Sequence, residues 1–236
     1  MKELIVVNIG RTKYADAWEL QKQIFSARLK QRISDVLLFT EHDHVYTLGK
    51  AADNNHLLAK DEELLNKGVD VFWIDRGGDI TYHGPGQIVG YPIIDLNDHY
   101  HDIHRYLRDI EEAIIRALQE YNITAGREPE YTGVWVKNEK IAAIGVKVSK
   151  WITMHGFALN VNTDLSFFDR IIPCGIFHKG VTSLQQILGR EIALEEVQQH
   201  LIYHFQQLFQ WEIKHISPEE LITMLRHNEA EIEETQ

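Results

Sequence analysis

Residues 75–92 read DRGGDITYHGPGQIVGYP, and this stretch holds five glycines and two prolines. It follows the strand-like segment VDVFWI (69–74) and runs into the apolar segment YPIIDL (91–96). Deformable backbone therefore separates two segments that both have the composition of a protein core. Glycine accepts backbone angles that other residues avoid, and it allows a ligand to approach main-chain N–H groups directly. The stretch is therefore a candidate for a pair of tight turns or for a binding loop.

The polar residues between the glycines favour a binding loop over turns alone. Arg76, Thr81, Tyr82 and His83 stand at positions where Asn, Ser or Asp would serve a purely structural turn equally well. The usual nucleotide loops are excluded, because neither GxxxxGK[ST] nor GxGxxG occurs in the stretch. We therefore expect a ligand-binding loop that does not cradle phosphates in either of these ways.

The composition is that of one globular domain. The chain has 236 residues, of which 44% are hydrophobic, and this suffices for a sizeable core. We expect a single domain over residues 1–236, with the helix at about 217–236 as a candidate appendage. No segment approaches the ~18 consecutive apolar residues of a membrane span, and the apolar run near the N-terminus is too short for a secretory signal, so a cytoplasmic protein is expected. The formal net charge of −11 disfavours a general nucleic-acid binder.

The chain has one cysteine, Cys174, which excludes an intramolecular disulfide and a multi-cysteine metal site. Histidine-rich runs at 42–44 and 99–104 lie in polar, loop-like sequence, and we expect no metal site in either. Cys174 is therefore either a buried core thiol, which is common for an unpaired cysteine, or a reactive one.

Helix-like and strand-like periodicities follow one another along the chain without long linkers. Strands are expected at 4–10, 36–40, 45–48, 69–75, 88–96, 133–136, 140–149 and 154–162, and helices at 14–32, 61–67, 104–121, 194–211 and 218–236. Expected strands occur in groups along the sequence and helices follow them, without strict βαβ alternation. This order predicts an α+β fold, in which a mixed β-sheet is flanked by helices.

Three separated parts of the sequence resemble one known family. RGGDITYHGPGQIVGYPIIDL (76–96), KIAAIGVKV (140–148), and HGFALNVNTDL (155–165) followed by IIPCGI (171–176) are similar, in the same order, to the signature blocks of the lipoyl(octanoyl) transferases. The resemblance implies the catalytic fold that biotin and lipoate protein ligases share. It also implies the reaction: an octanoyl group passes from octanoyl-acyl carrier protein to an enzyme cysteine, and then to a lysine amine on a lipoyl domain.

The same resemblance implies residue roles and partners. Cys174 lies at the family's nucleophile position, and Lys140 is its catalytic partner. The expected acceptors are the lipoyl domains of 2-oxoacid dehydrogenases and the H protein of glycine cleavage. The residues expected to line the acyl site are Arg76, Gly77, Gly78, Asp79, Ile80, Thr81, Tyr82, His83, Ala143, Ile144, Gly145, Gly156, Phe157 and Ala158. The small residues among them suggest a slot that is kept open for an acyl chain.

General chemistry agrees with a cysteine in this role. Transfer between two thioesters is close to energetically even, and transfer from a thioester to an amine forms a more stable amide, so we expect neither ATP nor another cofactor. The reaction does need a nucleophile that can leave again, and a thiolate does both.

The alternation of a β-strand would place the two lysines of the second block on opposite faces. Even-numbered residues from Lys140 to Val148 would share one face, and odd-numbered residues from Ile141 to Lys147 would share the other. A lysine on an apolar face is desolvated, and desolvation lowers its pKa. Lys140 could then stabilise the thiolate and later accept a proton from the incoming amine. The alternative, a strand-end lysine whose ammonium group reaches water, stays open from the residues alone.

Residues 131–180 are locally basic, with six Lys or Arg and three Asp or Glu in a chain that is acidic overall. Acyl carrier proteins and lipoyl domains are typically acidic, so a basic rim would steer both toward the site.

Two other functions remain open from the sequence. An ATP-dependent lipoate or biotin protein ligase of the same fold would need a nucleotide phosphate loop and no thiol. A non-catalytic acyl-binding module would use Cys174 for packing only.

Overall fold

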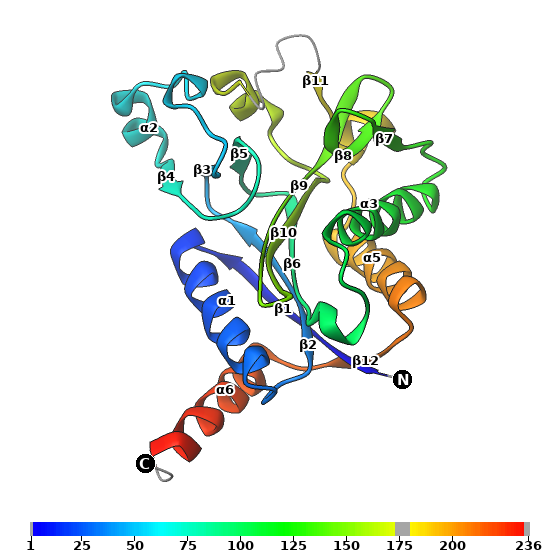
Figure 1. Cartoon of the computed structure of the whole chain (residues 1–236). Helices are drawn as coiled ribbons and strands as arrows, with labels where there is room; N and C mark the ends of the chain where they lie inside the picture. Colours follow the sequence, from blue (N-terminus) through cyan, green and yellow to red (C-terminus); the bar gives the residue numbers. More distant parts are fainter. Residues whose placement is uncertain (1, 173–179, 234–236) are drawn as a thin grey trace.

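The structure is a computed structural model that describes residues 2–172 and 180–233 (Figure 1). A large β-sheet carries helices on both faces, and a small three-stranded sheet lies beside it. The predicted α+β class with a mixed sheet is confirmed. The strands are β1 (Lys2–Thr12), β2 (Asp35–His42), β3 (Val45–Leu48), β4 (Asp70–Trp73), β5 (Ile80–His83), β6 (Gln87–Ile93), β7 (Gly126–Glu128), β8 (Tyr131–Val136), β9 (Glu139–Ser149), β10 (Ile152–Asn160), β11 (Gly180–Val181) and β12 (Trp211–His215). The α-helices are α1 (Tyr14–Leu29), α2 (Asp61–Lys67), α3 (Ile103–Gln119), α4 (Leu184–Leu188), α5 (Leu194–Phe209) and α6 (Pro218–Glu233), and the 3-10 helices are η1 (Asn54–His56), η2 (Leu96–Asp98) and η3 (Leu165–Arg170).

The large sheet has the strand order β12-β1-β2-β6-β10-β9-β8-β7, and β11 pairs with β9. β1 runs parallel to both β12 and β2, whereas β2, β6, β10 and β9 pair antiparallel in succession. The sheet is therefore mixed, and its central strands come from distant parts of the sequence.

Both faces of the large sheet are buried, as β1 illustrates. Leu4 and Val6 belong to the core cluster that includes residues of α3 and α5, whereas Ile5 and Val7 belong to the cluster that includes residues of α1 and α6. A strand that is covered on both faces needs apolar residues at every position, which accounts for the continuous run LIVV near the N-terminus.

Among the described residues, the sequence analysis missed four strands, namely β5, β7, β11 and β12, and the short helix α4. β5 lies within the glycine-rich stretch and pairs antiparallel with β3, and its four residues were expected to be loop. β12 begins at Trp211, which was expected to end a helix. That helix ends at Phe209 because Gln210 adopts a left-handed conformation with φ of 58°.

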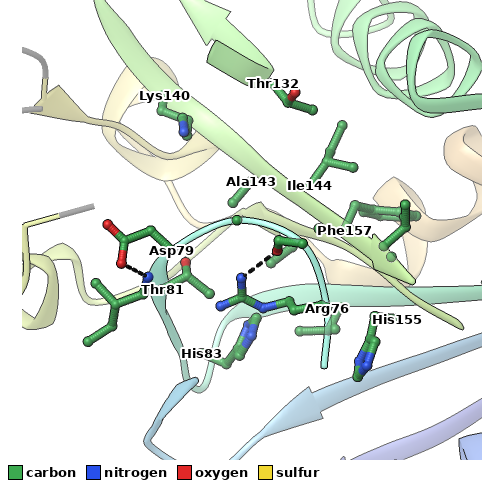
Figure 2. A pocket seen from close by; sticks show the side chains of 18 of the residues that line it. Arg76, Asp79, Thr81, His83, Thr132, Lys140, Ala143, Ile144, His155 and Phe157 are labelled. Carbon is green, nitrogen blue, oxygen red and sulfur yellow. Dashed lines mark hydrogen bonds between the residues drawn. The ribbon is translucent and has the colours of Figure 1, made fainter. Parts of the chain in front are cut away.

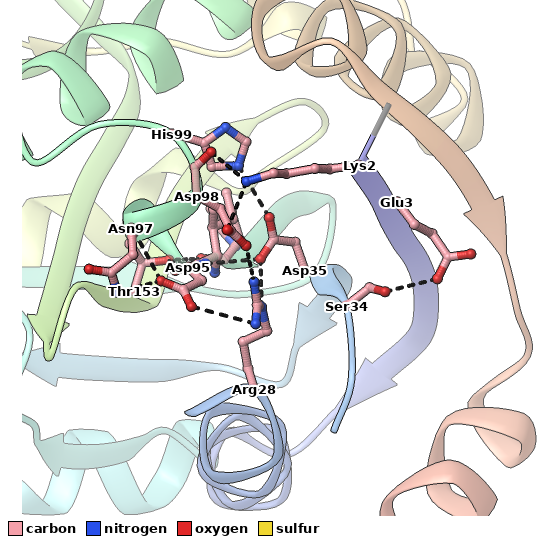
Figure 3. A network of polar contacts seen from close by, with 12 residues as sticks. Lys2, Glu3, Arg28, Ser34, Asp35, Asp95, Asn97, Asp98, His99 and Thr153 are labelled. Atoms are coloured by element: carbon pink, nitrogen blue, oxygen red, sulfur yellow. Dashed lines mark hydrogen bonds and ion pairs between the residues drawn. The ribbon is translucent and has the colours of Figure 1, made fainter. Parts of the chain in front are cut away.

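A buried cluster of charges ties α1 to the large sheet (Figure 3). The Arg28 guanidinium lies 2.8 Å from Asp35, 3.5 Å from Asp95 and 2.7 Å from Asp98. Burial alone would lower the pKa of Arg28, but the hydrogen bond and charge of Asp35, helped by the other two carboxylates, raise it. Arg28 therefore stays charged, and each of its partners fixes another segment of the chain to the end of α1.

The close approach of β6 and β10 predicts a large difference between two glycine substitutions. A Cβ atom on Gly156 would lie 2.1 Å from the carbonyl oxygen of Gly90, whereas one on Gly126 would meet nothing within 4 Å. Gly156→Ala should therefore lower the free energy of unfolding by about 2 kcal/mol or more. Gly126→Ala should change it by less than about 0.5 kcal/mol. Urea denaturation of both variants checks this, and equal effects would contradict the packing argument.

Candidate active site

A cavity of about 500 Å³ lies where the loop between β4 and β5 meets strands β9 and β10 (Figure 2). Residues of β6, β8, β11, the first two turns of α3, and Tyr14, Glu130 and Phe168 also line it. Fourteen of the predicted site residues line it, namely Arg76, Gly77, Gly78, Asp79, Ile80, Thr81, His83, Lys140, Ala143, Ile144, Gly145, Gly156, Phe157 and Ala158. The structure thus brings the first two sequence blocks and the start of the third to one place.

The other two predicted site residues are Tyr82 and Cys174. Tyr82 is fully buried away from the cavity, where its ring stacks on Phe167 with centroids 4.8 Å apart. Successive residues of a strand face opposite sides, so Thr81 and His83 reach the cavity and Tyr82 does not. Cys174 lies outside the described residues.

Glycines on β9 and β10 allow neighbouring chain segments, including the β4–β5 loop, to pack closely. The Gly77 N–H donates to the carbonyl oxygen of Val146 on β9 at 2.9 Å. A Cβ atom on Gly145 would lie 2.8 Å from the Gly77 carbonyl oxygen, and one on Gly156 would collide with Gly90. The expectation that small residues keep a slot open is therefore wrong for Gly145 and Gly156, because backbone atoms already fill the space in front of both.

Gly78 has a second reason to be glycine. Its φ is +84°, a left-handed conformation that side chains with a Cβ atom disfavour. Together with Gly77 it lets the chain turn so that Arg76 points inward. The buried Arg76 donates from Nη2 to the carbonyl oxygen of Thr47 at 2.7 Å and to its hydroxyl at 2.9 Å, which joins the loop to β3.

Lys140 lies near the start of β9, between β8 and β11. Its strand partners are Trp135 on β8 and Val181 on β11. Its Nζ atom lies 4.9 Å from the centroid of the Trp135 ring, a geometry in which the aromatic face attracts a cation. Lys140 therefore reaches the cavity from a strand that is held on both sides.

The predicted alternation of β9 is only partly correct. Ala142, Ile144, Val146 and Val148 all pack in or against the core cluster of α3 and α5, as expected. Ile141 joins the same cluster, which is contrary to the prediction. The reason is a register shift in the pairing with β8 between Val134 and Trp135. A bulge resets which side each residue faces, so the alternation cannot be carried through to Lys140.

Lys147 is engaged elsewhere. Its Nζ atom lies 2.5 Å from the Asp75 carboxylate, which is also 2.8 Å from Nε2 of His155. Burial would raise the pKa of Asp75, but hydrogen bonds from Lys147 and His155 lower it to about 2. Lys147 does not line the cavity, whereas Lys140 does.

Two buried histidines lie close together at the cavity: His83 lines it, and the ring centroid of His42 lies 5.8 Å from that of His83. Burial lowers the pKa of His83 to about 3, and the neighbouring His42 contributes to this. Burial likewise lowers the pKa of His42 to about 4, and its Nε2 lies 2.7 Å from the Tyr91 hydroxyl. Both rings are therefore neutral near pH 7.

The sequence analysis missed several polar residues that line the cavity, among them Tyr14, Gln87, Tyr91 and Asn160. The first three of these have less than 4% of their surface exposed and Asn160 has 4%. Gln87 is the first residue of β6 and Asn160 is the last residue of β10, and a polar residue at the end of a buried strand was the signal that could have identified them.

Within residues 2–172 and 180–233, no group of three or more His, Cys, Asp or Glu side chains could hold a metal ion. In the same residues, no helix combines the length and the apolar composition that crossing a membrane requires.

Sequence comparisons relate the chain to enzymes of lipoylation. Residues 13–206 match the family described as lipoyl protein ligase A/B catalytic domain. An octanoyltransferase of Christiangramia forsetii is 51% identical over 231 residues, which cover 91% of this chain and 99% of that protein. An octanoyltransferase of Rubrobacter xylanophilus is 57% identical over 201 residues, which cover 84% of this chain and 90% of that protein.

Solved structures share the fold at low sequence identity. A bipartite lipoate protein ligase from Thermoplasma acidophilum aligns with a TM-score of 0.72 and 18% identity, covering 96% of this chain and 92% of that one. A lipoate-protein ligase A bound with ATP aligns with a TM-score of 0.69 and 15% identity, covering 96% of this chain and 93% of that one. A biotin protein ligase from Aquifex aeolicus aligns more loosely, with a TM-score of 0.51 and 13% identity, covering 89% of this chain and 70% of that one. The fold expected from the sequence is thereby confirmed.

The lowered histidine pKa values predict a loss of stability on mild acidification. His42 and His83 have folded-state pKa values of about 4 and about 3, against an ordinary value of 6.5. Below pH 6.5 the unfolded chain therefore binds protons that the folded protein does not, so the free energy of unfolding should fall as the pH falls. Each histidine contributes a slope of up to about 1.4 kcal/mol per pH unit. In urea denaturation between pH 6.5 and 5, His42→Gln should reduce this slope, and an unchanged slope would show that His42 is not buried as described.

Proposed function

Because the chain belongs to the lipoyl protein ligase A/B catalytic domain family, among its octanoyltransferases, we propose that it moves the octanoyl group in two steps through a thioester on Cys174. The enzyme transfers octanoyl groups in protein lipoylation. In our proposal the donor is octanoyl-acyl carrier protein, and the acceptors are lipoyl domains of 2-oxoacid dehydrogenases and the glycine cleavage H protein. We further propose that residues 1–236 act as one catalytic domain in the cytoplasm.

In the first step the Cys174 thiolate, stabilised by the Lys140 ammonium group, attacks the carbonyl carbon of the octanoyl thioester. A new carbon–sulfur bond forms, the bond to the carrier breaks, and the carrier leaves as a thiolate that takes up a proton from Lys140, which becomes a neutral amine. In the second step the acceptor lysine amine attacks the same carbon. A carbon–nitrogen bond forms, Cys174 leaves as a thiolate, and the amine proton passes to Lys140.

The observation that carries this proposal is the place of Lys140 in the cavity. It lies there beside β11, and Gly180 and Val181 of β11 also line the cavity. The chain's one cysteine precedes Gly180 by six residues. A cationic lysine favours the thiolate form of a nearby thiol, and a thiolate is the reactive form.

The proposed acyl site is the cavity itself. Ile144, Phe157, Ala143 and Ala158 contribute apolar surface to its wall. Burial of the six or seven methylene-sized groups of an octanoyl chain would contribute about 5 kcal/mol at ~0.8 kcal/mol each. Binding energy of this size supports a preference for chains that fit the cavity.

Fewer basic side chains of residues 131–180 are available to steer acidic partners than the sequence implied. Lys147 and Arg170 form ion pairs with Asp75 and Glu63, and Lys140 lies in the cavity. Lys137 and Lys150 are exposed, and they are the described cations of this segment that support steering.

A labelling experiment tests the covalent intermediate. After incubation with octanoyl-acyl carrier protein, mass spectrometry should find an octanoyl adduct on Cys174 that hydroxylamine removes, because hydroxylamine cleaves thioesters. Cys174→Ser is nearly isosteric, so it should fold normally and lose the adduct and the transfer activity. Octanoate supplied with ATP should give no product. A transfer rate of Cys174→Ser within about tenfold of the wild-type rate would contradict the covalent mechanism.

A matched pair of lysine variants tests the partner of the thiol. Lys140→Met keeps the length of the stem and removes the charge, so the apparent thiol pKa should move up toward the ~8.5 of an unperturbed cysteine. Lys147→Met should leave this pKa nearly unchanged, because Lys147 pairs with Asp75. The rate of iodoacetamide labelling at the one cysteine, measured against pH, reports both values. If Lys147→Met raised the thiol pKa and Lys140→Met did not, Lys147 would be the partner of the thiol.

A further inference from the structure

We propose that Gln87 and Asn160 are positioning residues that hold Lys140 in place through a directional chain of buried hydrogen bonds. The inference rests on the role proposed above for Lys140, and it concerns residues to which neither the sequence motifs nor the reaction chemistry gave a role. Both side chains line the cavity beside His83 and Val181, and Gln87 has 1% and Asn160 4% of its surface exposed.

The chain runs from His83 on β5 to Lys140 on β9. Nδ1 of His83 lies 2.9 Å from Oε1 of Gln87, and Nε2 of Gln87 lies 2.9 Å from Oδ1 of Asn160. Nδ2 of Asn160 lies 3.1 Å from the carbonyl oxygen of Thr182. The N–H of Thr182 then donates to the carbonyl oxygen of Lys140 at 3.0 Å. Four consecutive hydrogen bonds therefore connect the two ends.

One backbone atom sets the direction of every bond in this chain. The Thr182 carbonyl oxygen can only accept, so the Asn160 amide must turn its NH₂ group toward Thr182 and its oxygen toward Gln87. Gln87 must then turn its own NH₂ group toward Asn160, and this group also donates to the Tyr82 carbonyl oxygen at 3.2 Å. The remaining Gln87 oxygen faces His83, so Nδ1 of His83 must carry the proton.

The same logic assigns the other nitrogen of His83. A neutral ring with its proton on Nδ1 has an acceptor at Nε2, which lies 3.4 Å from the Thr47 hydroxyl. That hydroxyl accepts from Arg76 at 2.9 Å, so its own proton is available for His83. The low pKa that burial imposes on His83 agrees with a neutral ring. His83 therefore donates from Nδ1 to Gln87 and turns its acceptor nitrogen, Nε2, toward Thr47.

Lys140 needs such support because of its place in the sheet. The pairing of β9 with β8 is shifted between Val134 and Trp135, next to the pairing of Trp135 with Lys140. On the other side, two of the described residues, Gly180 and Val181 of β11, pair with this end of β9. Asn160 extends this contact, because it binds the carbonyl oxygen of Thr182 immediately after β11. A displacement of about 1 Å at a catalytic group can cost roughly a hundredfold in rate.

The test is a double-mutant cycle between Asn160→Leu and Lys140→Met. Leucine is close to asparagine in size and removes both hydrogen bonds. If Asn160 acts through Lys140, Asn160→Leu should lower octanoyl transfer to Cys174 at least about tenfold and raise the apparent thiol pKa when Lys140 is present. In the Lys140→Met background it should change the rate by less than about twofold and leave the thiol pKa unchanged.

Asn162→Leu is the matched control. Asn162 also makes two side-chain hydrogen bonds to backbone, both with Ile192 (2.7 and 3.0 Å), and it does not line the cavity. Asn162→Leu should lower stability in urea denaturation and leave the thiol pKa unchanged. If Asn160→Leu and Asn162→Leu affect the thiol pKa equally, Asn160 has only a structural role and the proposal is overturned.

Two further outcomes separate this inference from the proposed function. If Lys140→Met changes the thiol pKa but Asn160→Leu slows transfer equally in both backgrounds, the positioning role is overturned and the function of Lys140 stands. If Lys140→Met has no effect on rate or thiol pKa, both proposals fall. Should Asn160→Leu not fold, Gln87→Met interrupts the chain one bond earlier and takes its place in the same cycle.

Discussion

The main-chain oxygen of Gly77 lies only 2.8 Å from the point where a side chain of residue 145 would begin. This contact, with the hydrogen bond from the Gly77 N–H to Val146, holds the loop of the small sheet against β9 of the large one. The cavity exists because these two sheets meet here. Glycine at position 145 is therefore a steric requirement, whereas a Cβ atom at position 77 would make only an ordinary contact, 3.5 Å from the Val146 carbonyl oxygen.

The same contact determines the polarity of the cavity wall. Arg76, which precedes Gly77, is turned inward and bound by Thr47, and the buried histidines behind it are kept neutral. A buried cation surrounded by neutral acceptors is stable only when its hydrogen bonds are satisfied, so the wall is rigid as well as polar. Lys147 is neutralised by Asp75 on the rim of this wall. The two lysines of one strand thus have different environments, which is the basis for assigning them different roles.

The fold by itself says little about the reaction. A lipoate-protein ligase A bound with ATP aligns with a TM-score of 0.69 but only 15% identity, so the fold is shared with a protein that binds ATP. The distinction lies in side chains at the site, as is usual for folds that serve several reactions. In this chain those side chains include Lys140 and one cysteine, and the close relatives over most of the chain are octanoyltransferases.

The sequence alone determined every described α-helix except the short α4, most strands and most of the residues that gather at the cavity, because hydrophobic periodicity and local motifs depend on near neighbours along the chain. It did not reveal β5, whose four residues are flanked by glycines and form a strand only by pairing with β3. It placed Ile141 on the wrong face, because the register shift in β9 depends on its pairing with β8. The roles of Gly145 and Gly156, and the hydrogen bonds that join Gln87 and Asn160 to Lys140, were decided by tertiary structure, since each depends on atoms from a segment that is distant in the sequence.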